Sequence, residues 1–405
     1  MSRISVLVRD RNVFLAVVTV ISAAKLLLSA IEPASFDIRD TIALNSSYRN
    51  PLGPWIALYP PLYGHIANST QLQTWLFTPP PNMDANMQLT SLLFRLPVFA
   101  FDLATAVVLY YTVKKLASPT EGRLASLVWF LNPFSMFAVE LLGVPDVVAT
   151  LLIVVAFGLL VSRRPILSGV AIGIGVWVKF FPILLLPPLL LYARMNGLAR
   201  RIQAAVFCLG LTGLAGYLSW ILPFGSYYMT LYTPVTQPMP FIAGFSAVNG
   251  SAFVLIFFYC LLGLFAKKNN SLLAVLLPTL LVYYAVSNPY PQYLIWALPL
   301  MALDVSLVKR SRALLFVLFN AFAFAQWFFT SSGFLTPSGY SLLMIPLGGD
   351  VVPWYSRLVT SLLENYSSIL LLPLVSSGLY ACLLVYAADI ARSWFGFSSN
   401  KISEP

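Results

Sequence analysis

The sequence predicts an all-α polytopic membrane protein with about twelve transmembrane helices, within a range of about ten to thirteen. Of its 405 residues, 59% are hydrophobic and only 9% are charged, whereas soluble domains carry roughly 25% charged residues. Apolar runs close to the length of a membrane span follow one another along the chain. The basic residues also gather in alternate connections, as a fixed orientation in a membrane requires.

The apolar runs give the positions of the expected helices. A span needs about 20 apolar residues, with a range of roughly 17 to 25. The fifth and sixth runs are short and are interrupted by Lys179 and Pro182, so they fit either two shallow spans or one re-entrant pair. The runs are residues 12–31, 91–111, 123–139, 147–162, 165–178, 182–193, 202–223, 251–266, 271–287, 291–308, 313–330 and 366–388.

The basic residues predict the orientation. With the N-terminus in the cytoplasm, 18 of the 24 basic residues fall in cytoplasmic segments. This is the positive-inside pattern, so both termini are expected in the cytoplasm. The net charge of +10 is then an orientation signal, and a nucleic-acid partner is not expected. The exceptions are Arg39, Arg49 and Arg357 in outer connections and Lys25, Arg95 and Lys179 in or beside spans.

The long connections all lie on the predicted outer face. They cover about residues 32–90, 224–250 and 331–365, and the inner connections are short. Functional sites concentrate in loops held by a rigid scaffold, so the outer face is the expected place of the site. Residues 1–405 are expected to form a single integral-membrane domain. The three cysteines lie in apolar runs, which excludes a disulfide scaffold or a cysteine-rich metal site.

Asp37 and Asp40 are the first candidates for chemistry. They follow the first span by a few residues in a chain with only 14 acidic residues. If this stretch is helical, their spacing places both carboxylates on one face. A partly desolvated carboxylate can act as a general base. The alternative is a solvated loop acid or a helix N-cap.

Two further acids, Glu140 and Asp146, are expected at the outer surface between the third and fourth spans. Asp146 has the position of a helix N-cap, whose carboxylate accepts from first-turn amides. The functional alternative for both acids is contact with a sugar or acceptor near the entrance of the site.

Three basic residues lie within the apolar segments. Lys179 precedes a proline at the outer end of its segment and either snorkels to the lipid headgroups or binds an anionic phosphate. Arg95 lies near the outer end of the second span and is a second candidate phosphate ligand. Asp102, seven residues after Arg95 on the same helix face, is expected to form a structural ion pair, with Lys25 of the first span as the candidate partner.

Polar and aromatic residues at the outer face supply further candidate contacts for sugar or acceptor. Gln292, Tyr293 and Trp296 begin the tenth span and are able to bind a sugar by hydrogen bonds and stacking, although Tyr and Trp also populate ordinary interfacial belts. Tyr59 and His65, the only histidine, lie in the first outer loop beside the two candidate acids.

An ordered series of motifs over roughly residues 35–300 resembles the GT-C superfamily of membrane glycosyltransferases. The series consists of the acids after span one, "NPLGPWIALYPPLYG", "FDLATAVVLYY", "LNPFSMF…GVPD", "GVAIGIGVWVKFFPILLLPP" and "PQYLIWALPL". It is most similar to the GPI mannosyltransferase I catalytic subunit and to related prokaryotic enzymes. That family typically has D-x-D in the first outer loop, whereas this chain has D-x-x-D. The base is therefore either Asp37 or Asp40, with Asp37 preferred because it lies closer to the membrane.

The resemblance implies an inverting transfer of a sugar, mannose first, from a polyprenyl (dolichyl) phosphate to a hydroxyl of a lipid-linked glycan or glycolipid. An aspartate takes the acceptor proton, and Lys179 and Arg95 stabilise the leaving phosphate. No metal or other cofactor is expected, because the leaving group carries one phosphate. The site is expected on the extracytoplasmic or luminal side, in a prokaryotic plasma membrane or the ER membrane, with a small membrane subunit as a further partner.

Two other functions compete with this prediction. One is a twelve-span secondary transporter, although the chain shows no similar halves of the kind such transporters contain. The other is a noncatalytic or flippase component of a glycan pathway.

Overall fold

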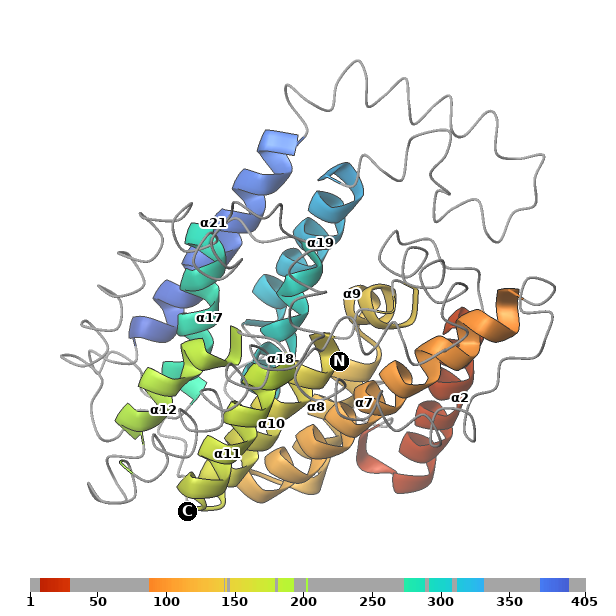
Figure 1. Ribbon diagram of the computed structural model, residues 1–405, viewed down its shortest axis with the longest axis horizontal. Coiled ribbons are helices and arrows are strands. Elements are labelled where there is room, and N and C mark those ends of the chain that lie inside the picture. Colours follow the sequence, from red (N-terminus) through yellow and green to blue (C-terminus); the bar gives the residue numbers. More distant parts are fainter. Residues whose placement is uncertain are drawn as a thin grey trace, which may run out of the picture.

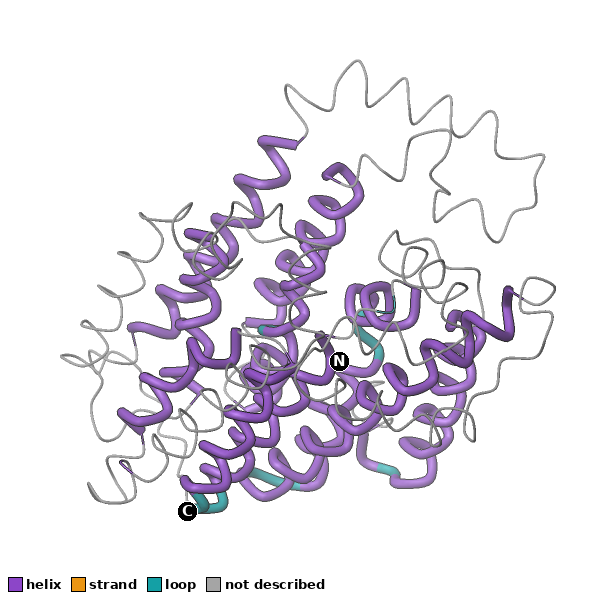
Figure 2. Tube along the Cα trace, in the orientation of Figure 1, coloured by secondary structure: helices purple, strands orange, loops and turns teal. Residues whose placement is uncertain are grey.

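The computed structural model describes residues 8–29, 87–141, 143, 146–178, 181–192, 202, 273–287, 291–307, 312–330 and 372–392. Within these ranges the secondary structure is helical and contains no strand (Figures 1 and 2). The all-α class is therefore confirmed for the described part of the chain. Nearly all of the predicted outer connections, and the runs expected at 202–223 and 251–266, lie outside it.

The first two expected spans coincide with two long apolar helices. They are α2 (Arg11–Ser29) and α7 (Met87–Leu116). Among the described helices, α2 and residues 95–116 of α7 are long and apolar enough to cross a membrane, and several apolar helices are shorter. An all-α membrane protein is consistent with these lengths, while the number of spans stays a prediction.

The third expected span, residues 123–139, is broken into three pieces. These are α8 (Pro119–Phe130), α9 (Pro133–Met136) and the π-helical turn η2 (Phe137–Leu141). Asn132 caps α9, because its side chain accepts hydrogen bonds from the backbone N–H groups of Phe134 and Ser135. Pro133 has no N–H to continue α8, so the Asn-Pro pair ends one helix and begins the next. The expected span therefore contains a helix break at Asn132 and Pro133.

The next three runs coincide with helices. They form α10 (Asp146–Val161), α11 (Pro165–Val178), the 3₁₀ turn η3 (Phe181–Leu185) and α12 (Leu186–Tyr192). The turn between α10 and α11 passes through Arg163, whose φ is 57°. α10 packs against both α11 and α7, so it connects these two helices.

The C-terminal helices also follow the apolar runs. They are α17 (Leu273–Ser287), the 3₁₀ turn η5 (Pro291–Trp296), α18 (Leu298–Leu307), α19 (Ala313–Thr330) and α21 (Leu372–Ala391). Figure 1 shows α17, α19 and α21 on the opposite side of the molecule from α2 and α7. α21 packs on both α17 and α19.

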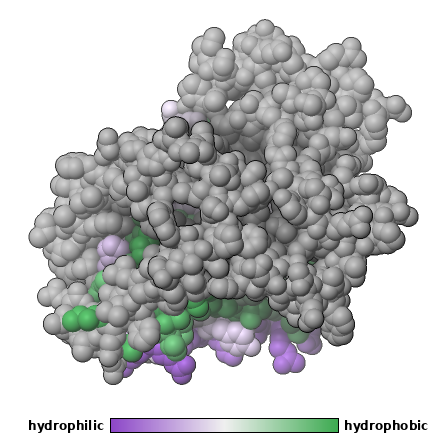
Figure 3. Space-filling view, in the orientation of Figure 1, coloured by the Kyte–Doolittle hydropathy of each residue, from purple (hydrophilic) through white to green (hydrophobic). Residues whose placement is uncertain are grey.

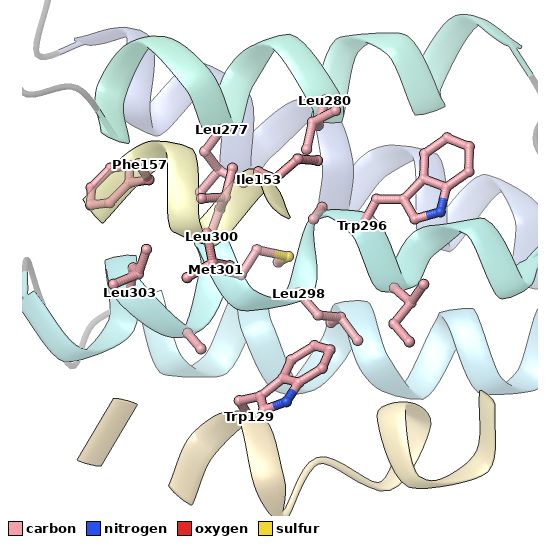
Figure 4. Close-up of a cluster of buried hydrophobic side chains, with 14 of the residues drawn as sticks. Trp129, Ile153, Phe157, Leu277, Leu280, Trp296, Leu298, Leu300, Met301 and Leu303 are labelled. Atoms are coloured by element: carbon pink, nitrogen blue, oxygen red, sulfur yellow. The ribbon is translucent and has the colours of Figure 1, made fainter. Parts of the chain in front are cut away.

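α18 lies at the centre of the described helices. All of its residues from Leu298 to Asp304 are buried. Figure 4 shows Leu298, Leu300 and Met301 of this helix between Trp129 of α8 and Leu277 of α17. A helix that is apolar all round has to be buried in protein or in lipid, and here protein covers it. The outer helices instead expose large apolar side chains, such as Leu27 at 72% and Leu374 at 67%, as a lipid-facing surface would.

Hydrophilic residues gather along one edge of the molecule. Figure 3 shows them on the lower edge, with hydrophobic residues directly above them. Exposed basic side chains among the described residues occur at helix ends and turns, and include Arg9, Arg11, Lys114, Lys115, Arg163 and Arg164. All of these belong to segments predicted to be cytoplasmic.

Candidate functional site

Three segments from distant parts of the sequence meet at Trp296. Its indole Nε1 donates a 2.9 Å hydrogen bond to Oδ1 of Asp146. Its ring stacks on Phe181, with the ring centroids 3.4 Å apart and the planes within 1°. All three side chains are buried. Asp146, Phe181 and Trp296, which belong to three separate motifs of the sequence, therefore share one packed junction.

Local sequence explains why each segment changes direction at this junction. Asp146 is the first residue of α10, and Trp296 is the last residue of η5. Phe181 begins η3 and is followed by Pro182, which disfavours α-helical backbone at the preceding residue. A Cβ added at Gly175 would lie 3.3 Å from Cγ of Pro182, so η3 folds back closely against α11. This packing fixes η3 against α11.

A second polar cluster, which we call the Lys25 cluster, joins α2, α7 and η2. Nζ of Lys25 lies 2.7 Å from Oδ2 of Asp102 and 3.2 Å from both carboxylate oxygens of Glu140. All three side chains are fully buried. The ammonium group also lies 4.5 Å from the ring centroid of Phe130. The predicted Lys25–Asp102 ion pair is confirmed, and Glu140 is an additional member that sequence reasoning missed.

Arg95 extends this cluster to the end of α2. Its Nη1 donates a 3.1 Å hydrogen bond to the carbonyl oxygen of Ser29, the last residue of α2. A cation is favourable there, because the unpaired carbonyls give the C-terminus of a helix a partial negative charge. The side chain is 1% exposed and interacts electrostatically with Glu140. Arg95 was predicted as a ligand of the donor phosphate, whereas these contacts hold α2 against α7.

Glu140 and Asp146 were expected at the outer surface, and both are instead buried inside the protein, at 0% and 2% exposure. Gly143, with φ of 64°, lies between them in the turn that connects η2 to α10. Each carboxylate is engaged by an internal donor, Lys25 for Glu140 and Trp296 for Asp146. Their assignment as contacts to sugar or acceptor stays a prediction.

Several predicted site residues lie outside the part that the structure describes. Gln292 and Tyr293 fall within η5, but only the backbone of these two residues is described. Trp296, considered at the sequence level as a sugar-stacking residue, uses its ring for Phe181. The residues wholly outside the described ranges are Asp37, Asp40, Tyr59, His65 and Lys179.

No group of three or more His, Cys, Asp or Glu side chains among the described residues is arranged to hold a metal ion. The Lys25 cluster and the Trp296 junction both lie in segments that precede or follow predicted outer connections. Both arrangements place irregular backbone, in η2, η3 and η5, next to buried polar side chains.

Comparison with known proteins gives two partial matches. The model of the family "GPI transamidase subunit PIG-U" matches residues 68–233. The protein "GPI mannosyltransferase 1" of Kluyveromyces lactis is 26% identical over 116 residues. That match covers 29% of this chain and 29% of the yeast protein. No solved structure matches the chain. The chain is therefore similar in part to a family of GPI transamidase subunits and to a GPI mannosyltransferase.

Proposed function

We propose that this chain is an inverting membrane glycosyltransferase. It moves a sugar, with mannose as the first candidate, from a polyprenyl phosphate to a hydroxyl of a lipid-linked acceptor on the non-cytoplasmic face. The observation that carries this proposal is the junction at Trp296, because three of the motifs that resemble the glycosyltransferases pack against one another there. The partial identity with GPI mannosyltransferase 1 supports the same reaction class.

In the proposed reaction, the acceptor oxygen attacks the anomeric carbon from the side opposite the phosphate. Asp37 or Asp40 takes the hydroxyl proton as the new C–O bond forms. The bond between the anomeric carbon and the phosphate oxygen breaks, and polyprenyl phosphate leaves with an added negative charge. Lys179 is the residue that would stabilise this charge. Arg95 contributes indirectly, since it holds the end of α2 from which the first outer connection starts.

The reaction implies a membrane setting and lipid substrates. Both donor and acceptor are lipids, so the substrates reach the site from the membrane. The proposed compartment is the lumen of the ER or the exterior of a prokaryotic cell, depending on the source of the chain. Residues 1–405 are proposed to act as one domain, with about twelve spans of the GT-C type and both termini in the cytoplasm.

An in vitro transfer assay tests this proposal. The full chain is purified in nanodiscs and incubated with polyprenyl phosphate mannose and a panel of glycolipid acceptors. Wild type is expected to form a product with inverted anomeric configuration. Replacing the base by asparagine, in Asp37→Asn or Asp40→Asn, should lower kcat by about 10²- to 10⁴-fold while the protein stays folded. Absence of transfer from every polyprenyl phosphate sugar tested would overturn the proposal.

A second function is favoured by the match to the PIG-U family over residues 68–233. In this case the chain is a noncatalytic subunit that holds a lipid-linked glycan for a partner enzyme. The same two variants separate the possibilities. A noncatalytic subunit should keep its function when Asp37→Asn and Asp40→Asn are combined in one double variant, and it should co-purify with its partner. A transferase that carries the same double variant should lose turnover.

A further inference from the structure

We propose that the basic residues at the predicted cytoplasmic end of the helices form a surface that binds the headgroups of anionic phospholipids. This surface, which we call the basic rim, belongs to residues 8–14, 110–123 and 162–165. These three segments contain seven basic and only two acidic residues. The inference does not depend on the proposed transfer reaction. The basic residues of the rim are Arg9, Arg11, Lys114, Lys115, Arg123, Arg163 and Arg164.

Side-chain contacts bring the first two segments together at one end of the molecule. The ring of Phe14 in α2 stacks on that of Tyr110 in α7, with the centroids 6.3 Å apart. Nη1 of Arg123 in α8 donates hydrogen bonds to the backbone oxygens of Val8, at 2.8 Å, and Arg9, at 2.6 Å. Short loops lie along the lower edge of the molecule in Figure 2, and hydrophilic residues gather along the same edge in Figure 3.

The turn between α10 and α11 lies at the same end. Nζ of Lys115 in α7 donates a 3.0 Å hydrogen bond to Oγ of Ser162. The backbone N–H groups of Arg163 and Arg164 donate back to carbonyl oxygens of α10, both at 2.8 Å. With the φ of 57° at Arg163, these bonds form a Schellman motif, which ends the helix in a defined turn. Two exposed arginines are therefore held in a fixed turn beside Lys115.

The two acidic residues of these segments serve the ends of their own helices. Oδ1 of Asp10 accepts hydrogen bonds from the backbone N–H groups of Asn12 and Val13 at the start of α2. The carboxylate of Glu121, in the first turn of α8, accepts from the hydroxyl of Ser118, which caps that helix. Their charges offset only part of the positive charge of the basic rim, so the rim attracts anions.

The basic rim directly follows a surface suited to lipid. Along α7, Val107 and Tyr111 are both exposed and lie one helical turn apart, and Lys115 follows after one more turn. Tyrosine is enriched where a membrane meets water. Nζ of Lys114 lies 5.8 Å from the ring centroid of Tyr110 and 6.0 Å from that of Tyr111. The order from apolar to aromatic to basic therefore places the rim at the level of the lipid headgroups.

This position favours a lipid over a soluble anion as the occupant of the basic rim. The attraction of a basic segment to anionic lipids falls off within a Debye length of the membrane surface, so basic residues directly beyond the interfacial aromatics experience it most. Guanidinium groups form strong, charge-assisted hydrogen bonds with phosphate oxygens. A soluble acidic ligand would need the basic residues but not the lipid-facing surface that continues into them.

Native mass spectrometry of the purified full chain in detergent tests the proposal. It compares binding of phosphatidylglycerol with binding of phosphatidylcholine that carries the same acyl chains. Wild type is expected to bind phosphatidylglycerol about tenfold more tightly. The quadruple variant Lys114→Gln/Lys115→Gln/Arg163→Gln/Arg164→Gln should bind the two lipids within about twofold of each other. Added salt should reduce the preference of wild type, because it screens exposed charges.

Two single variants give a matched comparison. Arg164→Gln removes one charge from the basic rim and should weaken binding of phosphatidylglycerol about threefold to fivefold. Arg392→Gln removes one charge from an exposed arginine outside the rim, which lies 4.0 Å from Asp389, and should change binding less than about twofold. Lys114→Arg/Lys115→Arg keeps the charge and should keep the lipid preference. These variants keep the test decisive if the quadruple variant does not fold.

Four results would overturn the assignment of the basic rim to anionic lipid. They are equal binding of both lipids by wild type, an unchanged preference in the quadruple variant, equal weakening by Arg164→Gln and Arg392→Gln, and displacement of phosphatidylglycerol by an equal concentration of soluble glycerol 3-phosphate. The last result would indicate a site for a soluble anion. Failure of the transfer assay would leave the basic rim intact, because lipid binding is measured without turnover.

Discussion

Nζ of Lys25 lies 2.7 Å from Oδ2 of Asp102, and neither side chain is exposed. This pair holds α2 at one position along α7. α2 needs such a contact, because only 17% of its apolar stretch is buried within the protein. Apolar surface that faces lipid gives little preference for one position of the helix along its neighbour. Polar groups inside a membrane pair with one another, since each is costly alone. The Lys25 cluster therefore specifies where α2 sits.

Loss of the Lys25 ammonium should be strongly destabilising. Lys25→Met leaves Asp102 and Glu140 buried without their shared cation, and breaking a buried pair in this way costs about 3–5 kcal/mol. Thermal unfolding of the purified protein in detergent measures the effect. Lys115→Met is the matched control, because Lys115 is exposed and its described hydrogen bond, to Ser162 at 3.0 Å, lies at the surface, so its replacement should cost about 0–1 kcal/mol. Similar melting temperatures for the two variants would contradict the prediction.

Arg312 should matter far more than its neighbour in space, Arg392. Arg312 contacts Oδ1 of Asp304 at 2.6 Å and Oδ2 of Asp389 at 2.7 Å, and thereby links α18 to α21. Arg392 is 75% exposed and only 4.0 Å from Asp389. Arg312→Met should cost about 3–5 kcal/mol, and Arg392→Met about 0–1 kcal/mol. Unfolding in detergent compares them, and the reverse order of stability would refute this interpretation.

The hydroxyl of Tyr386 gives a finer test of the same contact. It donates a 2.8 Å hydrogen bond to Oδ2 of Asp304, and the residue is 1% exposed. Tyr386→Phe keeps the ring and removes the donor, so the cost should be about 1–3 kcal/mol. In an Asp304→Asn/Tyr386→Phe cycle the two changes should be non-additive. Strict additivity would show that the hydroxyl does not stabilise the carboxylate.

Asp10 should contribute to stability in a pH-dependent way. Its Oδ1 accepts hydrogen bonds from the backbone N–H groups of Asn12, at 2.7 Å, and Val13, at 3.1 Å. The bond from Val13, then that from Asn12, lowers the pKa of Asp10 below its ordinary value of 3.8. Because the folded pKa is the lower one, the stabilisation is present above the unfolded pKa and is lost as the pH falls through the folded pKa.

Melting temperatures from pH 6 down to about pH 3 check this dependence. Wild type should lose stability over the acidic end of this range more steeply than Asp10→Asn, whose amide oxygen still caps the helix but does not titrate. Glu121→Gln controls for the loss of an unrelated acid near the same surface. Parallel curves for wild type and Asp10→Asn would contradict the assignment.

The sequence predicted the positions of the described helices well, because apolar runs of span length are a direct consequence of lipid as the solvent. The break at Asn132 and Pro133 was missed, although Asn-Pro is a turn signal visible in the sequence; the apolar residues on both sides masked it. The Lys25–Asp102 pair was predicted because buried charges have to be paired. The contact of Glu140 with Lys25 was not predicted, because Glu140 lies in the π-helical turn η2 and no local sequence pattern indicates that turn.

The candidate site was less predictable than the fold. Trp296 and Asp146 are residue types that are expected at an outer binding surface. Aromatic and acidic residues occur both in binding sites and in membrane interfaces, so their presence alone does not assign a role. Only the three-dimensional packing shows that each serves as the partner of the other. Arg95 was likewise predicted to bind a phosphate because of its charge and its position near the outer end of the second span. Its contact with Ser29 depends on the packing of α2 against α7, which the sequence does not show.

The packing of α10 on α7 should depend on Gly158, which lies close to Thr112 of α7. A Cβ added at Gly158 would lie 2.7 Å from Oγ1 of Thr112, and Thr112 is itself buried. Gly158→Ala should therefore cost about 1–3 kcal/mol through overpacking. The clash is with a side-chain oxygen, so the double variant Gly158→Ala/Thr112→Ala should recover part of the loss in a thermal unfolding cycle.

Gly122 provides the contrasting case. A Cβ there would lie 2.7 Å from the backbone oxygen of Tyr110, and no side-chain substitution removes a backbone carbonyl. Gly122→Ala should therefore be destabilising in a way that Tyr110→Ala does not rescue, because α8 would have to move away from α7 as a whole. Either of two outcomes would contradict this role of the two glycines in close helix packing. One is that Thr112→Ala fails to rescue Gly158→Ala, and the other is that Tyr110→Ala fully rescues Gly122→Ala.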